Sequence, residues 1–406
     1  MIRHYLKLIW NRRRSNLLIT IEIFFSFLVV FGVVAMAAYY GNNYRRPLGF
    51  TIDDVWVVNI DAKLQGLPGN QPNPQGIIET GRQLRLAVVE FPEVRALASC
   101  FTVPYGNSRW MSTSKVGGRE IAYSMDGVTD GFAEVFGLTL VQGRWFNRDD
   151  DAAGWDPVVV NEHLAADVFD TVNPVGRTFP QDKPSPGEKQ KEWRVVGVIR
   201  EFRQDGELAL PENYLMIRVR LDDVESALSL GRLPIKVRPG TTAAFEERLV
   251  KRMQEVARDW SFEVEPAIDM REQKLRDTLT PLIAAGVIAG FLMLMVALGL
   301  TGVVWQSVTQ RTREIGLRRA KGATIPDIRT QVMGELAVMA TIAVLLGAAI
   351  VVQFPLLKLV GNVTAGVYAA SLVISSLSIY LLTLASAWYP SRMATSVPPA
   401  EALHYE

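Results

Sequence analysis

Long apolar runs alternate with ordinary polar sequence along this chain, and four of the runs are long enough to cross a bilayer. They cover residues 17–40, 281–305, 333–354 and 368–388. A membrane-spanning α-helix takes about 20 apolar residues, so the pattern predicts four transmembrane helices. Residues 41–280, between the first two runs, have the mixed composition of a water-soluble domain.

The soluble segment is predicted to be an α+β domain with two lobes. Residues 55–60 are strand-like and a helical apolar stripe follows them, while residues 241–260 and 262–265 predict a helix and a short closing strand. Strand-like segments dominate an insertion at about residues 105–211. This order predicts one strand–helix–strand lobe made from both ends of the domain, and a second, β-rich lobe.

The N-terminal residues 1–16 predict a basic amphipathic helix at the membrane interface. They carry five basic side chains, and Ile2, Tyr5, Leu6 and Ile9 fall on one helical face. The excess of positive charge before the first span places the N-terminus in the cytoplasm. A cleavable signal peptide is the competing interpretation, but the length of the basic and apolar stretches favours an uncleaved anchor. Four spans then make residues 355–367 a short outer loop and residues 389–406 a cytoplasmic tail.

The loop at residues 306–332, between the second and third spans, is predicted to be cytoplasmic because it is strongly basic. Glu314 and Arg318 are four positions apart in the favourable order for a helical ion pair. Gly322 predicts the end of that helix, and Thr324 with Asp327 predicts a capped start of the next one. A basic loop that only rests on anionic lipid headgroups is the simpler alternative.

Composition excludes several kinds of chemistry. The net charge of +1 gives no general attraction to nucleic acid, and the single cysteine, Cys100, excludes an intrachain disulfide. The sequence contains no P-loop motif, so ATP would have to be hydrolysed by a separate subunit. It also lacks a nucleophile motif and a metal-binding spacing. We therefore expect a non-enzymatic chain without a bound cofactor or metal.

Two acids and one glycine pair stand out within the spans. Glu22 and Glu335 are ionisable residues in membrane helices, where charge is unfavourable and often functional. Both lie near the predicted cytoplasmic ends, where a glutamate can reach headgroups or an arginine. Gly286 and Gly290 form a GxxxG pattern that permits close helix packing, within the chain or between two copies.

Residues 313–335, which contain REIGLRRAKGAT followed by spaced Ile, Gln and Glu, closely resemble the signature of the FtsX-like permease domain. That domain occurs in MacB-type and LolC/LolE-type ABC transporter subunits. Lys321 departs from the pattern, which more often has a large apolar residue there. The resemblance implies that this segment is the coupling helix that contacts the ATPase, through Arg311, Arg313, Glu314, Ile315, Gly316, Leu317, Arg318, Arg319, Gly322 and Ala323.

A second resemblance covers the soluble domain. The motifs GRWF at 143–146, VVVN at 158–161, PVG at 174–176 and VVGVI at 195–199 occur in the order typical of the MacB-like periplasmic core domain. The C-terminal residues 390–406 are also similar to the family's ending, with His404 in place of the usual arginine. Together the two resemblances cover most of the chain.

The resemblance implies a permease subunit in the cell inner membrane, with both termini in the cytoplasm and the large domain in the periplasm. ATP and Mg²⁺ would act in a partner ATPase, whose motion the permease would transmit to its periplasmic domain. A peptide, drug or lipoprotein would be exported or extracted. Other expected partners are membrane lipids, a second permease copy or paralogue and, in some systems, a periplasmic adaptor and outer-membrane channel.

Two other kinds of function stay open at this stage. An FtsX-like signalling protein would control a periplasmic partner without transport, although the size of the outer domain favours the transporter. A membrane-anchored enzyme is disfavoured because no catalytic constellation is present.

Overall fold

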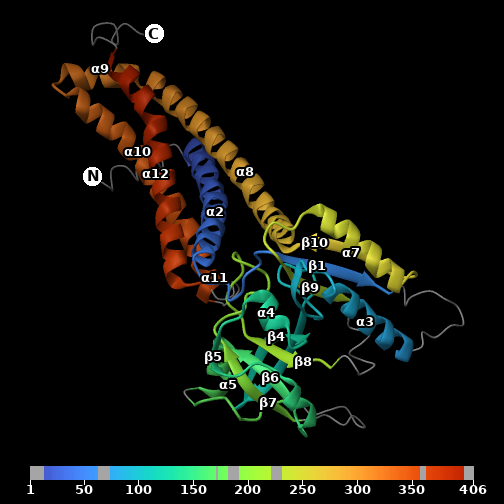
Figure 1. Cartoon of the computed structure of the whole chain (residues 1–406). Coiled ribbons are helices and arrows are strands. Elements are labelled where there is room, and N and C mark those ends of the chain that lie inside the picture. Colours follow the sequence, from blue (N-terminus) through green and yellow to red (C-terminus); the bar gives the residue numbers. More distant parts are fainter. Residues whose placement is uncertain are drawn as a thin grey trace, which may run out of the picture. The chain divides into compact units, whose positions relative to one another are not determined.

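Figure 1 shows the computed structural model, described for residues 13–62, 74–170, 172–181, 192–220, 231–356 and 363–396. The chain divides into two compact units, Met1–Asn42 with Thr278–Glu406, and Asn43–Asp277. Residues 1–12 of the expected interfacial helix, residues 357–362 of the expected outer loop and residues 397–406 of the expected tail lie outside the described residues.

Among the described residues, four long helices make up most of the first unit, and each is long and apolar enough to cross a membrane. They are α2 (Arg13–Tyr44), α8 (Ala267–Gln310), α10 (Ile325–Val351) and α12 (Ala365–Ser396), with the short α9 (Thr312–Ala320) and α11 (Gln353–Leu356). Helices α2, α8 and α12 extend beyond both ends of the apolar runs that predicted them, since helical hydrogen bonding continues through the polar residues there, whereas α10 starts before its run and ends within it, at Val351. Pro281 and Pro390 lie inside α8 and α12. The prediction of four spans with an α+β domain between the first two is confirmed.

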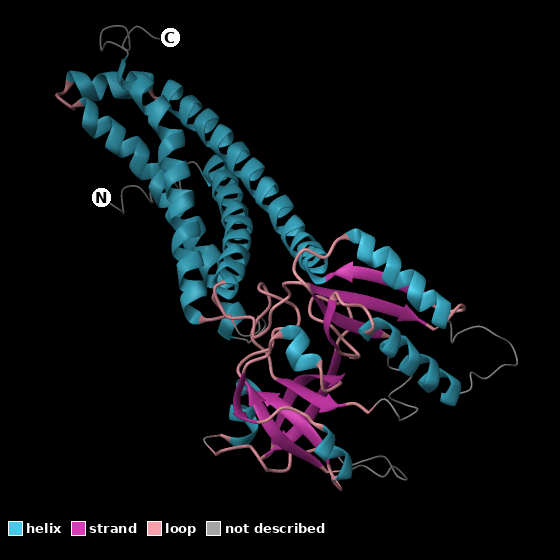
Figure 2. Ribbon diagram, in the orientation of Figure 1, coloured by secondary structure: helices cyan, strands magenta, loops and turns pink. Residues whose placement is uncertain are grey.

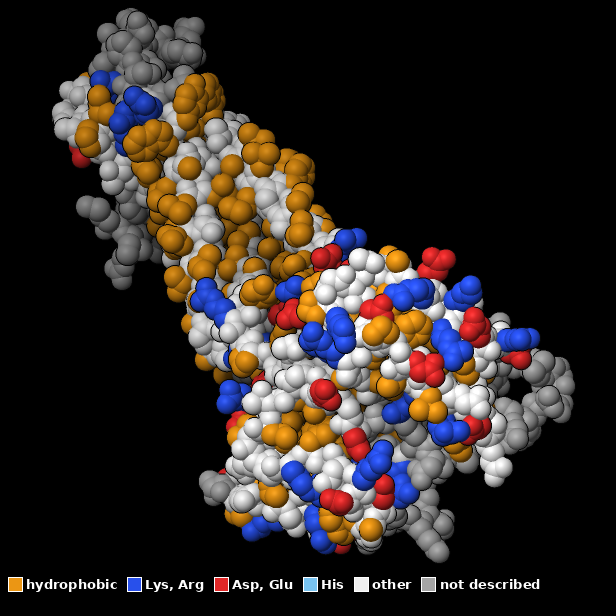
Figure 3. All heavy atoms as spheres, viewed as in Figure 1, with side chains coloured by type: hydrophobic (Ala, Val, Ile, Leu, Met, Phe, Trp, Pro, Cys, Tyr) orange, Lys and Arg blue, Asp and Glu red, His pale blue; other side chains and the backbone are white. Residues whose placement is uncertain are grey.

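Small residues let these helices pack closely. Phe27 on α2, Leu300 on α8 and Ala343 on α10 belong to one buried apolar cluster. A methyl group added to Gly347 on α10 would lie 2.3 Å from the Phe27 ring, so the glycine makes room for that ring. Hydrophobic side chains also cover much of the helices' visible outer surface, as expected for a surface that faces lipid (Figure 3).

The second unit contains a four-stranded antiparallel sheet in the order β10-β1-β9-β2. Its strands are β1 (Val55–Asp61), β2 (Val94–Leu97), β9 (Arg232–Val237) and β10 (Ser261–Pro266). Helices α3 (Pro74–Val89) and α7 (Ala243–Val256) cover one face, where Trp56 and Val58 pack against their apolar stripes (Figure 2). The alternate residues Val55 and Val57 are buried on the other face, which explains the continuous apolar run in β1.

A six-stranded mixed sheet in the order β3-β4-β8-β6-β7-β5 forms the second lobe of this unit. Its strands are β3 (Trp110–Val116), β4 (Arg119–Val128), β5 (Leu140–Gly143), β6 (Asp156–Asn161), β7 (Trp193–Ile199) and β8 (Tyr214–Arg218). Two short helices, α4 (Phe132–Phe136) and α5 (Glu162–Phe169), and a 3-10 turn at Arg148–Ala152 complete it. The sheet continues past the expected end near residue 211, because β8 pairs with both β4 and β6.

The two lobes meet at a point where a predicted strand ends early. The sequence of residues 94–103 predicts one continuous strand, but β2 stops at Leu97. The amides of Phe101 and Thr102 instead donate to the Asp126 carboxylate, each over 3.1 Å. Asp126 is only 1 % exposed, and this burial raises its pKa to about 8.

Asp126 should make the stability of the chain fall as the pH rises. Its pKa in the folded state lies above that of an unfolded aspartate, about 3.9, so the folded state holds the proton between the two values. Ionisation between about pH 5 and about pH 8 then lowers the free energy of unfolding. Asp126→Asn should lose less stability over that range than the wild type, measured by unfolding of the detergent-solubilised chain. The exposed Asp53→Asn is the control, and equal pH slopes for all three proteins would contradict the assignment.

Candidate functional site

The turn from α8 through α9 to α10 contains the residues that the sequence singled out. Helix α9 ends at Ala320, and Gly322 follows with φ +99°, a conformation that favours glycine. The Thr324 amide donates to the Asp327 carboxylate over 2.9 Å at the start of α10, which confirms the predicted cap. The local structure of this turn is therefore set by its own short-range sequence.

A chain of polar contacts fixes α9 against α10. Arg318 bonds both to Glu314 over 2.6 Å and to the Gln331 side chain over 2.5 Å. Gln331 in turn donates to Glu335 over 3.4 Å. Glu335 accepts two hydrogen bonds from Arg311, of 3.0 and 3.1 Å, and both side chains of this pair are mostly buried. Glu335, one of the two acids predicted to lie within the spans, thus has Arg311 as its counter-charge.

The two faces of α9 differ in chemistry. Ile315 and Gly316 are buried, and Ile315 packs with Ile328 and Val308. The opposite face is exposed and carries Arg313, Glu314, Leu317, Ala320 and Lys321. Leu317 is 50 % exposed, an apolar residue among charged ones. Figure 3 shows basic side chains gathered at the end of the helices where α9 lies. The exposed face therefore combines one large apolar side chain, Leu317, with charged neighbours.

The remaining predicted residues have different surroundings. Arg318, Arg319 and Ala323 are half-buried, and Gly322 is exposed. Glu22 lies against Gly299 of α8, where an added methyl group would come within 3.2 Å of its carboxylate. A methyl group added to Gly286 would lie 4.0 Å from the Val33 side chain, an ordinary van der Waals distance. One added to Gly290 would meet open space in the described part of the chain. The glycine pair is therefore not filled by a close helix contact within the described residues.

Sequence reasoning missed Gln331, which links Arg318 to Glu335. Its spacing of four residues from Glu335 was the available signal. No group of three His, Cys, Asp or Glu side chains among the described residues could hold a metal ion. In the acidic run at residues 149–151, Asp150 pairs with Arg144 and Asp151 with Arg218.

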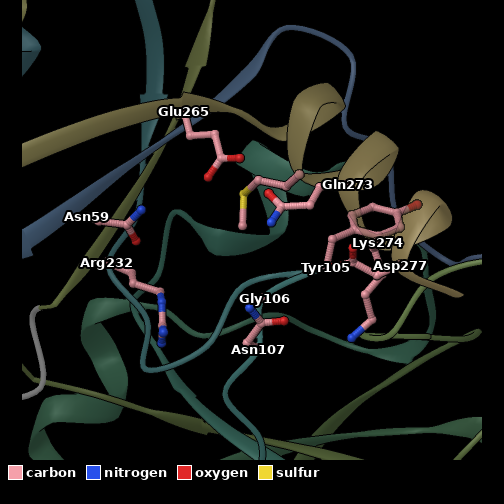
Figure 4. Close-up of a pocket in the computed structure, with 10 residues that line it drawn as sticks. Asn59, Tyr105, Gly106, Asn107, Arg232, Glu265, Gln273, Lys274 and Asp277 are labelled. Atoms are coloured by element: carbon pink, nitrogen blue, oxygen red, sulfur yellow. The ribbon is translucent and has the colours of Figure 1, made fainter. Parts of the chain in front are cut away.

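The second unit has a polar pocket of about 170 Å³ (Figure 4). Asn59, Arg232 and Glu265 line it from the four-stranded sheet, and Gln273 and Asp277 line it from the first turns of α8. Arg232 donates to the Phe101 carbonyl and to the Ser108 hydroxyl, so part of its hydrogen-bonding capacity is already used within the protein. We assign no ligand to this pocket. Its presence shows that there is open space between the first turns of α8 and part of the four-stranded sheet.

Two family descriptions match this chain. Residues 23–252 match the MacB-like periplasmic core domain, and residues 286–399 match the FtsX-like permease C-terminal domain. Both matches agree with the resemblances found in the sequence.

Curated relatives agree with these matches. The pyoverdine export ATP-binding/permease protein PvdT of Pseudomonas aeruginosa is 26% identical over 353 residues, which cover 83% of this chain and 50% of the relative. The macrolide export ATP-binding/permease protein MacB of Bdellovibrio bacteriovorus is 27% identical over 292 residues, which cover 69% and 43%. The chain thus spans about half the length of these relatives.

Among solved structures, the periplasmic region of MacB from Actinobacillus actinomycetemcomitans is similar to this chain. The TM-score is 0.35 and the identity 15%, and the match covers 55% of this chain and 92% of that one.

The Arg311–Glu335 pair should contribute more to stability than the Glu314–Arg318 pair on the same turn. Glu335→Gln leaves the mostly buried Arg311 without its counter-charge, which should cost about 2 kcal/mol. Glu314→Gln removes an exposed helical pair and should cost about 0.5 kcal/mol or less. Thermal unfolding of the chain in detergent checks the difference. A double-mutant cycle with Arg311→Gln that gives no coupling energy would show that the pair is unimportant.

Proposed function

Because the chain belongs to the family of ABC transporter permeases with a MacB-like periplasmic core domain and an FtsX-like permease domain, we propose that it transmits ATP-driven motion to its periplasmic domain. A partner ATPase binds and hydrolyses ATP with Mg²⁺ in the cytoplasm and supplies this motion. The permease catalyses no reaction itself. It is a multi-pass protein of the inner membrane.

The exposed face of α9 is the observation that carries this proposal. It lies on a short helix between two candidate spans, and its inner face is fixed by Ile315 and by the contacts of Arg318. A force applied to α9 is therefore passed to α10 instead of only bending a loop. Leu317 is the apolar anchor of the contact, and Arg313 is its charged neighbour. The basic charge of the loop supports a cytoplasmic location for this helix and for both termini.

The periplasmic domain acts on a substrate that is already outside the cytoplasm. Few ionisable side chains lie within the spans, so the helices themselves offer a poor path for a polar substrate. The two relatives described above are named for export of pyoverdine and of macrolides. Export of a small molecule is therefore favoured over lipoprotein extraction, with a second permease chain completing the assembly and an adaptor and outer-membrane channel as further candidates.

Signalling without transport is the alternative, as in the FtsX branch of the family. The match to the MacB-like core domain over residues 23–252 favours the transporter.

Disrupting the exposed face of α9 should release the ATPase without unfolding the permease. Leu317→Asp and Arg313→Glu should each lower the ATPase recovered per permease at least about tenfold, because each removes a central contact of about 1.4 kcal/mol or more. The measurement is co-purification in detergent with the candidate ATPase. Gly316 is unsuitable for this test because it is buried, and a large side chain there would disturb the turn.

Arg119→Glu is the matched charge reversal, at the exposed first residue of β4. It should retain the ATPase. Full recovery with both α9 variants would remove α9 as the contact, and a wild type that recovers no ATPase would overturn the transporter proposal itself.

A further inference from the structure

Part of the connection between β7 and β8, residues 201–209, bonds to the end of α2 and to the start of α8, and we call it the joint loop. Arg203 at its centre is fully buried. The Arg203 guanidinium donates to the carbonyls of Asn43 (3.1 Å) and Arg46 (3.0 Å), at the end of α2 and just beyond it. The Asn43 side chain donates in return to the Leu208 carbonyl over 3.1 Å. The two bonds from Arg203 end on backbone carbonyls, so a side-chain substitution at Asn43 or Arg46 would leave those acceptors in place.

The same loop binds the first turns of α8. Glu207, which is 6 % exposed, forms an ion pair with Arg271 and accepts a hydrogen bond from the Tyr105 hydroxyl over 3.1 Å. Asp205 pairs with Lys274 over 3.2 Å. Arg271 and Lys274 are about one turn apart, so two neighbouring ion pairs fasten one face of α8 to the loop.

Close backbone contacts leave the joint loop little freedom. A methyl group on Gly49, just after α2, would lie 1.9 Å from the Glu201 carbonyl oxygen, and one on Gly206 would lie 2.4 Å from the Tyr105 ring. Arg203 also donates to the carbonyls of Glu207 and Ala209 within the loop itself. The loop is therefore a packed, internally bonded element, and it moves as one piece with what it holds.

The loop is part of the six-stranded lobe, because it joins two strands of that sheet. His163 on α5 bonds to Glu201 over 3.0 Å, and the Tyr214 hydroxyl on β8 bonds to the Gln204 side chain over 3.1 Å. On its other side, α8 borders the open pocket next to the four-stranded sheet (Figure 4). Ion pairs join the base of α8 to the six-stranded lobe, while the helix also follows directly on β10 of the four-stranded sheet and borders the pocket beside that sheet.

We propose that the joint loop transmits the movement of α2 and α8 to the six-stranded lobe, with Arg271 and Lys274 as positioning residues. This inference rests on the proposed function, since it names the place where the motion of the spans enters the periplasmic domain. A displacement of α8 shifts Glu207 and Asp205 through their ion pairs. The six-stranded lobe then moves relative to the four-stranded lobe.

The test measures the distance between the two lobes in the permease–ATPase complex in lipid nanodiscs. Spin labels are placed at Lys115→Cys on β3 and at Glu247→Cys on α7, both exposed, with the buried Cys100 changed to Ala. Distances are compared without nucleotide and with Mg²⁺-ATP plus vanadate. Arg271→Gln is the test variant, and Arg276→Gln, an exposed position on the same helix, is the matched control.

Arg271→Gln should reduce the nucleotide-dependent distance change to less than about half of the wild-type value, while the ATPase stays bound and its ATP turnover, measured without vanadate, continues. Arg276→Gln should behave as wild type, and Arg271→Lys, which keeps the charge, should restore most of the change. A merely structural role would lower the melting temperature of Arg271→Gln without affecting the distance change. If Arg271→Gln unfolds, Lys274→Gln removes the neighbouring pair and takes its place.

A wild-type distance change in Arg271→Gln and Lys274→Gln would overturn the joint-loop inference and leave the proposed function intact. Loss of the ATPase from the wild-type complex would instead overturn the proposed function, and the inference with it. The two failures are therefore distinguishable in one set of samples.

Discussion

The absence of hydrogen-bonding partners in hydrocarbon is the constraint on which this structure depends. A chain that crosses lipid must satisfy every backbone group within its own helix, so each change of direction has to be made outside the apolar layer. The turn between α8 and α10 meets this requirement with a glycine, a capped helix start and a mostly buried ion pair between Arg311 and Glu335. Because the turn is fixed in this way, α9 can present one defined face.

The sequence predicted the spans well because their signal is long and purely compositional. Local signals within a few residues, such as Gly322 and the Thr324–Asp327 cap, also predicted the turn correctly. The orientation of α9 was harder to predict, because Ile315 and Leu317 are both apolar and only two positions apart. Packing against Ile328 buries the first and leaves the second exposed. No periodicity in nine residues could decide between them.

The joint loop could not be predicted for a different reason. Arg203 and Asn43 are separated by 160 residues, and their bonds run to backbone carbonyls, which any residue type provides. Neither pattern nor composition marks such a contact in one sequence. Asp126 is a similar case. Its carboxylate accepts a hydrogen bond from a backbone amide beyond β2, and the need for this acceptor is visible only because β2 ends at Leu97. Polar residues that replace missing backbone partners therefore become recognisable only in three dimensions.

Pro281 gives α8 a mechanical property that its length alone would not suggest. A proline has no N–H, so the carbonyl of Asp277 four residues earlier loses its helical donor. Asp277 is also the last residue of one compact unit, and Thr278 begins the next stretch of the other. The boundary between the units thus coincides with the place where α8 lacks one backbone hydrogen bond. A helix that lacks one backbone hydrogen bond bends more easily at that point than elsewhere along its length.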